Sequence, residues 1–224
     1  MVAKSNRAKR QLHAMRSKLA SGMSVQSSAP FLESASESLL DTLQLSPHAG
    51  GIAFICPSAA PISTVDALLG SPDVDAVQVC GEKMTTWKTS PDELVVLCRQ
   101  ISRTLRAGRT AAVHLDSHVQ GVAEPTPDSS RPFICSRLAQ VVPGLADEPT
   151  YIVAHGDEMA QMLVNIAGAD NPPVIGSLDG DVVVYQFGQD SYLAGVPLAV
   201  VPGRQAATSV VQAVNWFEAR RQLS

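Results

Sequence analysis

TYIVAHGDEMAQMLVNIAGA, residues 150–169, changes its hydrophobic period half-way along. Residues 151–154 form a short run of aromatic, β-branched and small apolar residues, which predicts a strand buried on both faces. After Gly156, apolar residues recur at helical spacing as far as Gly168, which stands where a helix C-cap belongs. A buried strand that passes through a glycine into a helix is typical of an α/β fold.

The turn at Gly156 is also a candidate binding site. The first turn of the following helix offers backbone N–H groups and the positive end of the helix dipole to an anion such as a nucleotide phosphate. The alternative is that the turn binds nothing, as is true of most such turns in α/β proteins. Taken alone, this stretch leaves both interpretations open.

The basic residues are concentrated near the N-terminus. Six of the 17 lie within residues 4–18, before the first acidic residue, Glu33, and the other 11 face 21 acidic residues. The 224 residues, 45% of them hydrophobic, suffice for one large domain or two small ones. Because the body of the chain is acidic, we do not expect it to bind nucleic acid over a broad surface.

The four cysteines, Cys56, Cys80, Cys98 and Cys135, contain no C-x-x-C pair. Their spacing is typical neither of a zinc framework nor of a dense disulfide scaffold. We therefore expect reduced thiols in a cytoplasmic protein. The sequence contains no run of 18 apolar residues and no signal-peptide core, so we expect neither a membrane span nor a membrane partner.

Strand and helix patterns alternate from residue 50 onward. Short apolar runs predict strands at residues 52–56, 76–80, 110–115, 151–154, 182–187 and 196–201. Amphipathic segments predict helices at residues 63–69, 90–107, 131–142, 158–167 and 209–221. This alternation predicts an α/β fold with a mostly parallel sheet of about six strands, flanked by helices on both faces.

The N-terminal residues are expected to be organised separately. We assign residues 1–49 to a basic N-terminal helical extension with a linker, and residues 50–224 to the α/β domain. Residues 3–20 predict a basic helix, residues 21–30 a linker, and residues 31–45 a second helix. The basic helix has the composition of an organellar transit peptide, but we favour a solvent-exposed helix.

Two polar segments form a candidate metal site. In HLDSH, residues 114–118, alternate side chains of a strand share one face, which brings together two imidazoles and a carboxylate. HGDE, residues 155–158, follows another strand, and ligands gather where parallel strands end. A hydrolytic metal needs about three protein ligands and an open position. The alternative is a solvated strand end, and we assign no residue as a metal ligand.

Common nucleotide-binding and hydrolase motifs are absent from the sequence. Neither G-x-x-x-x-G-K-[ST] nor G-x-G-x-x-G occurs, and no G-x-S-x-G surrounds Ser58. We therefore expect neither a Walker-type nor a Rossmann-type site, and no nucleophile elbow.

The order of several segments nevertheless resembles a known family. IAFICPSAAPIS at residues 52–63 is similar to a strand with a G-S-x-S-P-x-T turn, and LRAGRTAAVHLDS at residues 105–117 to a helix, strand and T-S-R-type turn. EPTYIVAHGDEM at residues 148–159 is similar to a strand with a K-G-G-x-T-S loop, and LAGVPLAVVPGRQAA at residues 193–207 to a strand with a P-G-N-x-G loop. Together they resemble the C-terminal nucleotide-binding domain of the four-carbon acid sugar kinases, long catalogued as a domain of unknown function.

This resemblance implies a domain that binds ATP, with Mg²⁺, against its glycine-rich turns. Carried over position by position, the nucleotide site contains Ser58, Ser117, Gly156, Asp157, Gly203 and Arg204. In the family, the sugar-acid site and the catalytic base belong to an N-terminal domain, so we assign no catalytic residue here.

Three positions of the K-G-G-x-T-S loop depart from the family pattern. The lysine is His155, the second glycine is Asp157, and the threonine is Met159. Asp157 and Glu158 have the wrong charge beside phosphates unless Mg²⁺ intervenes. Arg204, which stands at the asparagine of the last loop, restores some positive charge.

Three functions follow from these observations as hypotheses. The first is ATP binding, with transfer of the γ-phosphoryl group to a sugar-acid hydroxyl when a separate chain supplies the substrate domain, because residues 1–49 are too short for it. The second is a non-catalytic binding or assembly module on the same fold, which the altered loops favour. The third is a metal-dependent hydrolase. Self-association into a homo-oligomer is compatible with each of them.

Overall fold

The computed structural model describes residues 39–55, 68, 70–80, 91–116, 131–178, 181–203 and 207–224. Its strands are β1 (Ile52–Ile55), β2 (Val74–Cys80), β3 (Thr110–Asp116), β4 (Ile152–His155), β5 (Val174–Leu178), β6 (Val182–Gln186) and β7 (Pro197–Val201). Its helices are α4 (Pro91–Arg106), α5 (Arg131–Ala139), α6 (Asp157–Ala167) and α7 (Ala207–Leu223), with short 3-10 turns η1 (Leu39–Thr42) and η3 (Val142–Gly144). The predicted N-terminal extension lies mostly outside the described residues.

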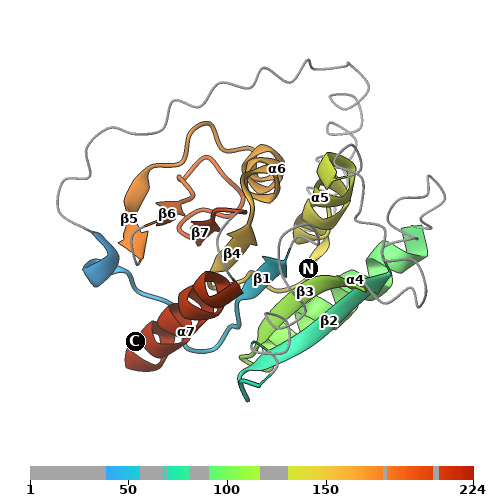
Figure 1. Ribbon diagram of the computed structural model, residues 1–224, viewed down its shortest axis with the longest axis horizontal. Coiled ribbons are helices and arrows are strands. Elements are labelled where there is room, and N and C mark those ends of the chain that lie inside the picture. Colours follow the sequence, from blue (N-terminus) through green and yellow to red (C-terminus); the bar gives the residue numbers. More distant parts are fainter. Residues whose placement is uncertain are drawn as a thin grey trace, which may run out of the picture. The chain divides into compact units, whose positions relative to one another are not determined.

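The strands form one sheet in the order β2-β3-β1-β4-β7-β6-β5 (Figure 1). The first five strands in this order are mutually parallel, whereas β6 is antiparallel to both of its neighbours. The predicted α/β class is therefore confirmed, with seven strands in the described part instead of about six. The strand missed by sequence analysis is β5, which follows two prolines and contains a register shift between Val174 and Gly176.

Helices cover both faces of the sheet. On one face, α4, α5 and α6 pack over a cluster that contains Phe54, Val113 and Ile152. The connections β2–α4–β3, β3–α5–β4 and β4–α6–β5 all cross the sheet in the same direction. Because such crossovers are right-handed, the three helices lie on the same face. On the other face, α7 packs over Val153 and Ala199. Figure 1 shows α7 across the sheet from α5 and α6.

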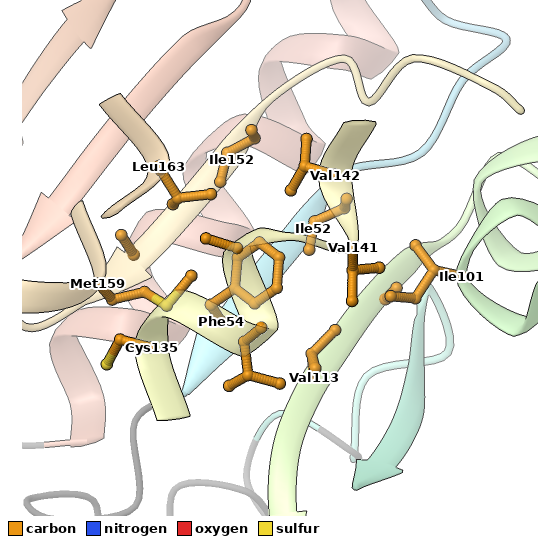
Figure 2. Close-up of a cluster of buried hydrophobic side chains, with 14 of the residues drawn as sticks. Ile52, Phe54, Ile101, Val113, Cys135, Val141, Val142, Ile152, Met159 and Leu163 are labelled. Atoms are coloured by element: carbon orange, nitrogen blue, oxygen red, sulfur yellow. The ribbon is translucent and has the colours of Figure 1, made fainter. Parts of the chain in front are cut away.

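The larger core surrounds the centre of the sheet. Figure 2 shows Phe54 of β1 among side chains from β3, β4, α5 and α6, with Met159 and Leu163 of α6 beside it. Every residue of β1 and β4 is buried, as the continuous apolar runs predict for strands covered on both faces. The core thus fixes the relative positions of β1 and β4, the two strands between which the chain changes direction.

Residues before β1 belong to the same packed body. Leu40, Leu43 and Leu45 are buried in the cluster under α7. The Ser46 N–H donates to Oγ1 of Thr150 at 2.9 Å, and the Gly50 N–H donates to the Leu105 carbonyl at the same distance. This segment is thereby tied to the sheet, while the boundary assigned at residue 50 stays a prediction.

Candidate functional site

The carboxyl ends of β1 and β4 form a topological switch point. These strands are neighbours, with Phe54 opposite Ala154, but the chain leaves them in opposite directions. After β1 it continues to β2 at one end of the sheet, and after β4 it continues through α6 to β5 at the other end. Ligands of open α/β sheets bind in the crevice at such a point.

Gly156 joins the end of β4 to the start of α6. Its φ of 93° and ψ of 143° lie in a region that favours glycine, and a Cβ there would have no neighbour within 4 Å. Its N–H donates to the Val201 carbonyl of β7 at 2.8 Å. No side chain caps the N-terminus of α6, so the N–H groups of its first turn are offered by the backbone without a capping oxygen.

Gly203 follows β7 and lies against Gly156. A Cβ placed on Gly203 would be 3.6 Å from the Gly156 Cα, which is ordinary van der Waals contact. Two of the six residues expected in the nucleotide site are therefore brought together, although they are 47 positions apart in the sequence. The parallel pairing of β4 with β7 is the physical reason, because it ends both strands at the same edge.

Negative charge lies at the same helix terminus. Asp157 and Glu158 are exposed in the first turn of α6, where they interact favourably with the helix dipole. Sequence analysis did not single out Tyr185 of β6, whose pKa is raised by burial and then by the negative charge of Asp157. Tyr185 packs on the same side of the sheet as α6. Its position in the predicted strand at residues 182–187 is the only sequence feature that pointed to its being in the sheet.

His155 is fully buried at the end of β4. Side chains alternate along a strand, so His155 shares the face of Tyr151 and Val153, the face covered by α7. The imidazole therefore does not lie on the exposed surface where α6 begins. The lysine position of the resembling family contributes no exposed cation in this protein.

Three of the six expected site residues lie in parts of the chain that the structure does not describe. Ser58, Ser117 and Arg204 lie outside the described residues, as does His118 of the HLDSH segment. Within the described residues, no group of three His, Cys, Asp or Glu side chains is placed to hold a metal ion. His114 is half-buried, with its Nδ1 3.3 Å from the Leu115 carbonyl oxygen. The metal-dependent hydrolase stays an untested hypothesis.

A solved structure shares this arrangement of helices and strands. A crystal structure of a domain of unknown function (DUF1537) protein from Bordetella bronchiseptica, a domain-swapped dimer with bound citrate, matches with a TM-score of 0.52. The identity is 13%, and the match covers 77% of this chain and 41% of the Bordetella chain. This chain has the DUF1537 fold. It spans less than half of the length of the Bordetella protein.

Other comparisons add little to this match. A second crystal form of the Bordetella protein gives a TM-score of 0.49 and 16% identity, over 78% of this chain and 40% of that chain. No protein-family model and no curated protein matches the sequence. Among the helices that the structure describes, none has both the length and the apolar character needed to cross a membrane.

Proposed function

We propose that the α/β body binds ATP, with Mg²⁺, at the carboxyl ends of β4 and β7. The observation that carries this proposal is the close approach of Gly156 and Gly203 beside the uncapped N-terminus of α6. Two adjacent glycines leave room for phosphates to approach the backbone, and the N–H groups of a helix N-terminus bind anions. This site borders the switch point between β1 and β4, because β4 is the neighbour of both β1 and β7, and this supports the same choice.

The reaction that this site favours is phosphoryl transfer to a hydroxyl group of a sugar acid. Such transfer depends mainly on positioning and on neutralising charge, which backbone N–H groups and a metal ion supply together. The fold shared with a DUF1537 protein supports the resemblance to the four-carbon acid sugar kinases. The sugar acid and the catalytic base would come from a separate chain or from a part of the protein beyond the region shared with the Bordetella structure.

The two carboxylates at the start of α6 favour a divalent cation beside the nucleotide. Asp157 and Glu158 are exposed in the first turn of α6 and repel the phosphates of free ATP. Mg²⁺ prefers carboxylate and phosphate oxygens and keeps several waters. Asp157 is therefore the residue that would hold the metal ion, which supplies charge neutralisation at the β- and γ-phosphates.

Calorimetry with the full chain tests this proposal. ATP at millimolar concentration should release heat in the presence of Mg²⁺, and Gly203→Val should weaken binding by at least about tenfold because its branches enter the space beside Gly156. Gly188→Val is the matched control, since a Cβ there has no neighbour within 4 Å, and it should bind as the unchanged protein does. Absence of binding heat from the unchanged, folded protein would refute the proposal.

A non-catalytic module is the second candidate function. It is favoured by the burial of His155 at the family's lysine position and by the replacement of small loop residues with Asp157 and Met159. In this case the protein binds a nucleotide or a protein partner without turnover. Phosphoryl transfer from ATP to a four-carbon sugar acid, by this chain alone or together with a substrate-domain chain, would exclude it.

A further inference from the structure

The segment before β1 covers part of the face of the sheet on which α7 lies. Residues 39–47, here called the strap, start with η1 beside β5 and pass α7 on the way to β1 (Figure 1). The buried side chains of the strap are Leu40, Leu43 and Leu45, and they belong to the cluster that also contains Ile175 of β5. The strap therefore shields apolar residues at the β5 edge of the sheet from solvent.

Side chains, and not a backbone ladder, attach the strap to its surroundings. Among the described residues, no backbone–backbone hydrogen bond joins residues 43–47 to another element. The end of α7 supplies three side-chain bonds: Nε of Arg220 to the Leu43 carbonyl at 3.1 Å, Nη1 of Arg221 to the Pro47 carbonyl at 3.1 Å, and Oγ of Ser224 from the Leu45 N–H at 3.5 Å. The backbones of β1 and β4, in contrast, are bonded to strands on both sides.

This difference in bonding predicts a difference in local stability. Segments with few backbone bonds to the sheet and with exposed residues open locally before the rest of a protein does. The strap meets both conditions, since Gln44, Ser46 and Pro47 are exposed next to its buried leucines. The strap should therefore open more readily than the strands that it covers.

Arg220 holds the strap without taking part in the buried pair of Glu218 and Arg221. A hydrogen bond from a charged guanidinium is stronger than one from a neutral donor. Arg221 also donates to Glu218, so its replacement would disturb that pair as well. The Arg220 contact can be removed while the pair stays in place.

We propose that the strap opens and closes over the β5 edge while the sheet stays folded, and that the hydrogen bond from Arg220 to the Leu43 carbonyl holds it closed. When the strap opens, its three leucines leave the cluster and the apolar side of β5 becomes accessible. The strap is thus a conformational device whose closed fraction is set by a few side-chain bonds. Its opening does not require the nucleotide proposed above.

Hydrogen exchange of the full chain, followed by mass spectrometry of its peptides, tests this device. In the unchanged protein, the amides of Leu45 and Ser46 should exchange at least about tenfold faster than those of β1 and β4. Arg220→Ala should raise the exchange rate of the strap by at least about tenfold, the effect of losing one hydrogen bond from a charged donor, and leave β1 and β4 unchanged. Arg103→Ala, at an exposed position of α4, is the matched control and should change neither rate.

The exchange rates also identify the results that overturn the proposal. One such result is a strap that exchanges no faster than β1 and β4 in the unchanged protein. Another is an Arg220→Ala variant in which the strap exchanges as before, or as fast as in Arg103→Ala. A third is an Arg220→Ala variant in which the strap and both strands accelerate by the same factor, because that result indicates opening of the whole fold.

Discussion

The Tyr151 hydroxyl donates a 2.7 Å hydrogen bond to Oε1 of Glu218, which lies 67 positions later in α7. The Thr110 hydroxyl is 2.5 Å from the same carboxylate oxygen, and Arg221 donates to the other oxygen through Nε at 3.1 Å. Arg221 also donates to the Pro47 carbonyl at 3.1 Å. This buried network joins the segment before β1, the amino edge of the sheet and α7, at the end of the sheet opposite to the paired glycines.

Removing a single group from this network should destabilise the protein. Tyr151→Phe leaves a buried carboxylate with one donor fewer, which costs about 1–3 kcal/mol of unfolding free energy. Glu218→Ala should cost more, about 3–5 kcal/mol, because Arg221 is then buried without its carboxylate. Denaturant titration measures both changes. Gln161→Ala, at an exposed helix pair, should change stability by less than about 0.5 kcal/mol, and an equal loss there would contradict this account.

Alkaline pH should unfold the protein through its tyrosines. Burial is the main cause that raises the pKa of Tyr151, Tyr185 and Tyr192 above the ordinary value of 10.0. Because the pKa of each tyrosine is higher in the folded state, the unfolded chain ionises first as the pH rises. The stabilisation of the fold by the neutral phenols is therefore complete below about pH 10. It is lost as the pH rises from there toward the folded pKa. Phenolate absorbance should therefore appear at higher pH in the folded protein than in denaturant. Coincident titration curves would contradict this prediction.

A side chain at Gly51 should not fit. Its Cβ would lie 2.2 Å from Cζ of the Tyr151 ring, which is held in place by stacking on Phe217 at a centroid distance of 4.5 Å. Gly51→Ala should therefore cost about 1–3 kcal/mol, as overpacking of a well-packed core does. Gly188→Ala, with no neighbour within 4 Å, should be neutral or stabilising by up to about 1 kcal/mol. Thermal unfolding of the two variants compares them directly.

Much of the fold could be predicted because the decisive signals are local. The buried runs at residues 52–56 and 151–154 are continuous, which sequence periodicity detects, and the structure places β1 and β4 there. The proximity of Gly156 and Gly203 followed from the order of segments in the resembling family. In contrast, β5 was missed because Gly176 and the register shift beside it interrupt the two-residue period.

Features that depend on distant residues could not be predicted. The hydrogen bond between Tyr151 and Glu218 depends on where α7 lies on the sheet, and no local sequence pattern predicts that position. The same holds for the burial of His155, which sequence analysis placed in the candidate metal-binding segment HGDE. Its side chain is buried because β4 extends through His155 and is covered on both faces, whereas the apolar run that predicted this burial ends at Ala154.

The cysteines should differ in their reactivity. Cys80 is exposed at the end of β2, Cys98 is half-buried, and Cys135 is buried in the core. Burial also raises the pKa of the Cys98 thiol, which lowers the fraction of reactive thiolate at neutral pH. Among these three cysteines, alkylation followed by peptide mass spectrometry should modify Cys80 first, then Cys98, and Cys135 only on unfolding. Modification of Cys135 as fast as Cys80 in the folded protein would contradict its burial.

Replacing Asp157 should change how nucleotide binding depends on Mg²⁺. If its carboxylate both repels phosphate and holds the metal ion, Asp157→Asn should tighten binding of metal-free ATP by up to about fivefold, the effect of one charge at a helix N-terminus. The same variant should weaken binding in the presence of Mg²⁺. The dissociation constant without Mg²⁺, divided by the one with Mg²⁺, should therefore fall. Asp190→Asn is the control, because Asp190 is exposed beyond the other edge of the sheet, between β6 and β7. An unchanged ratio in Asp157→Asn would remove Asp157 from the site and leave the backbone of α6 as the phosphate contact.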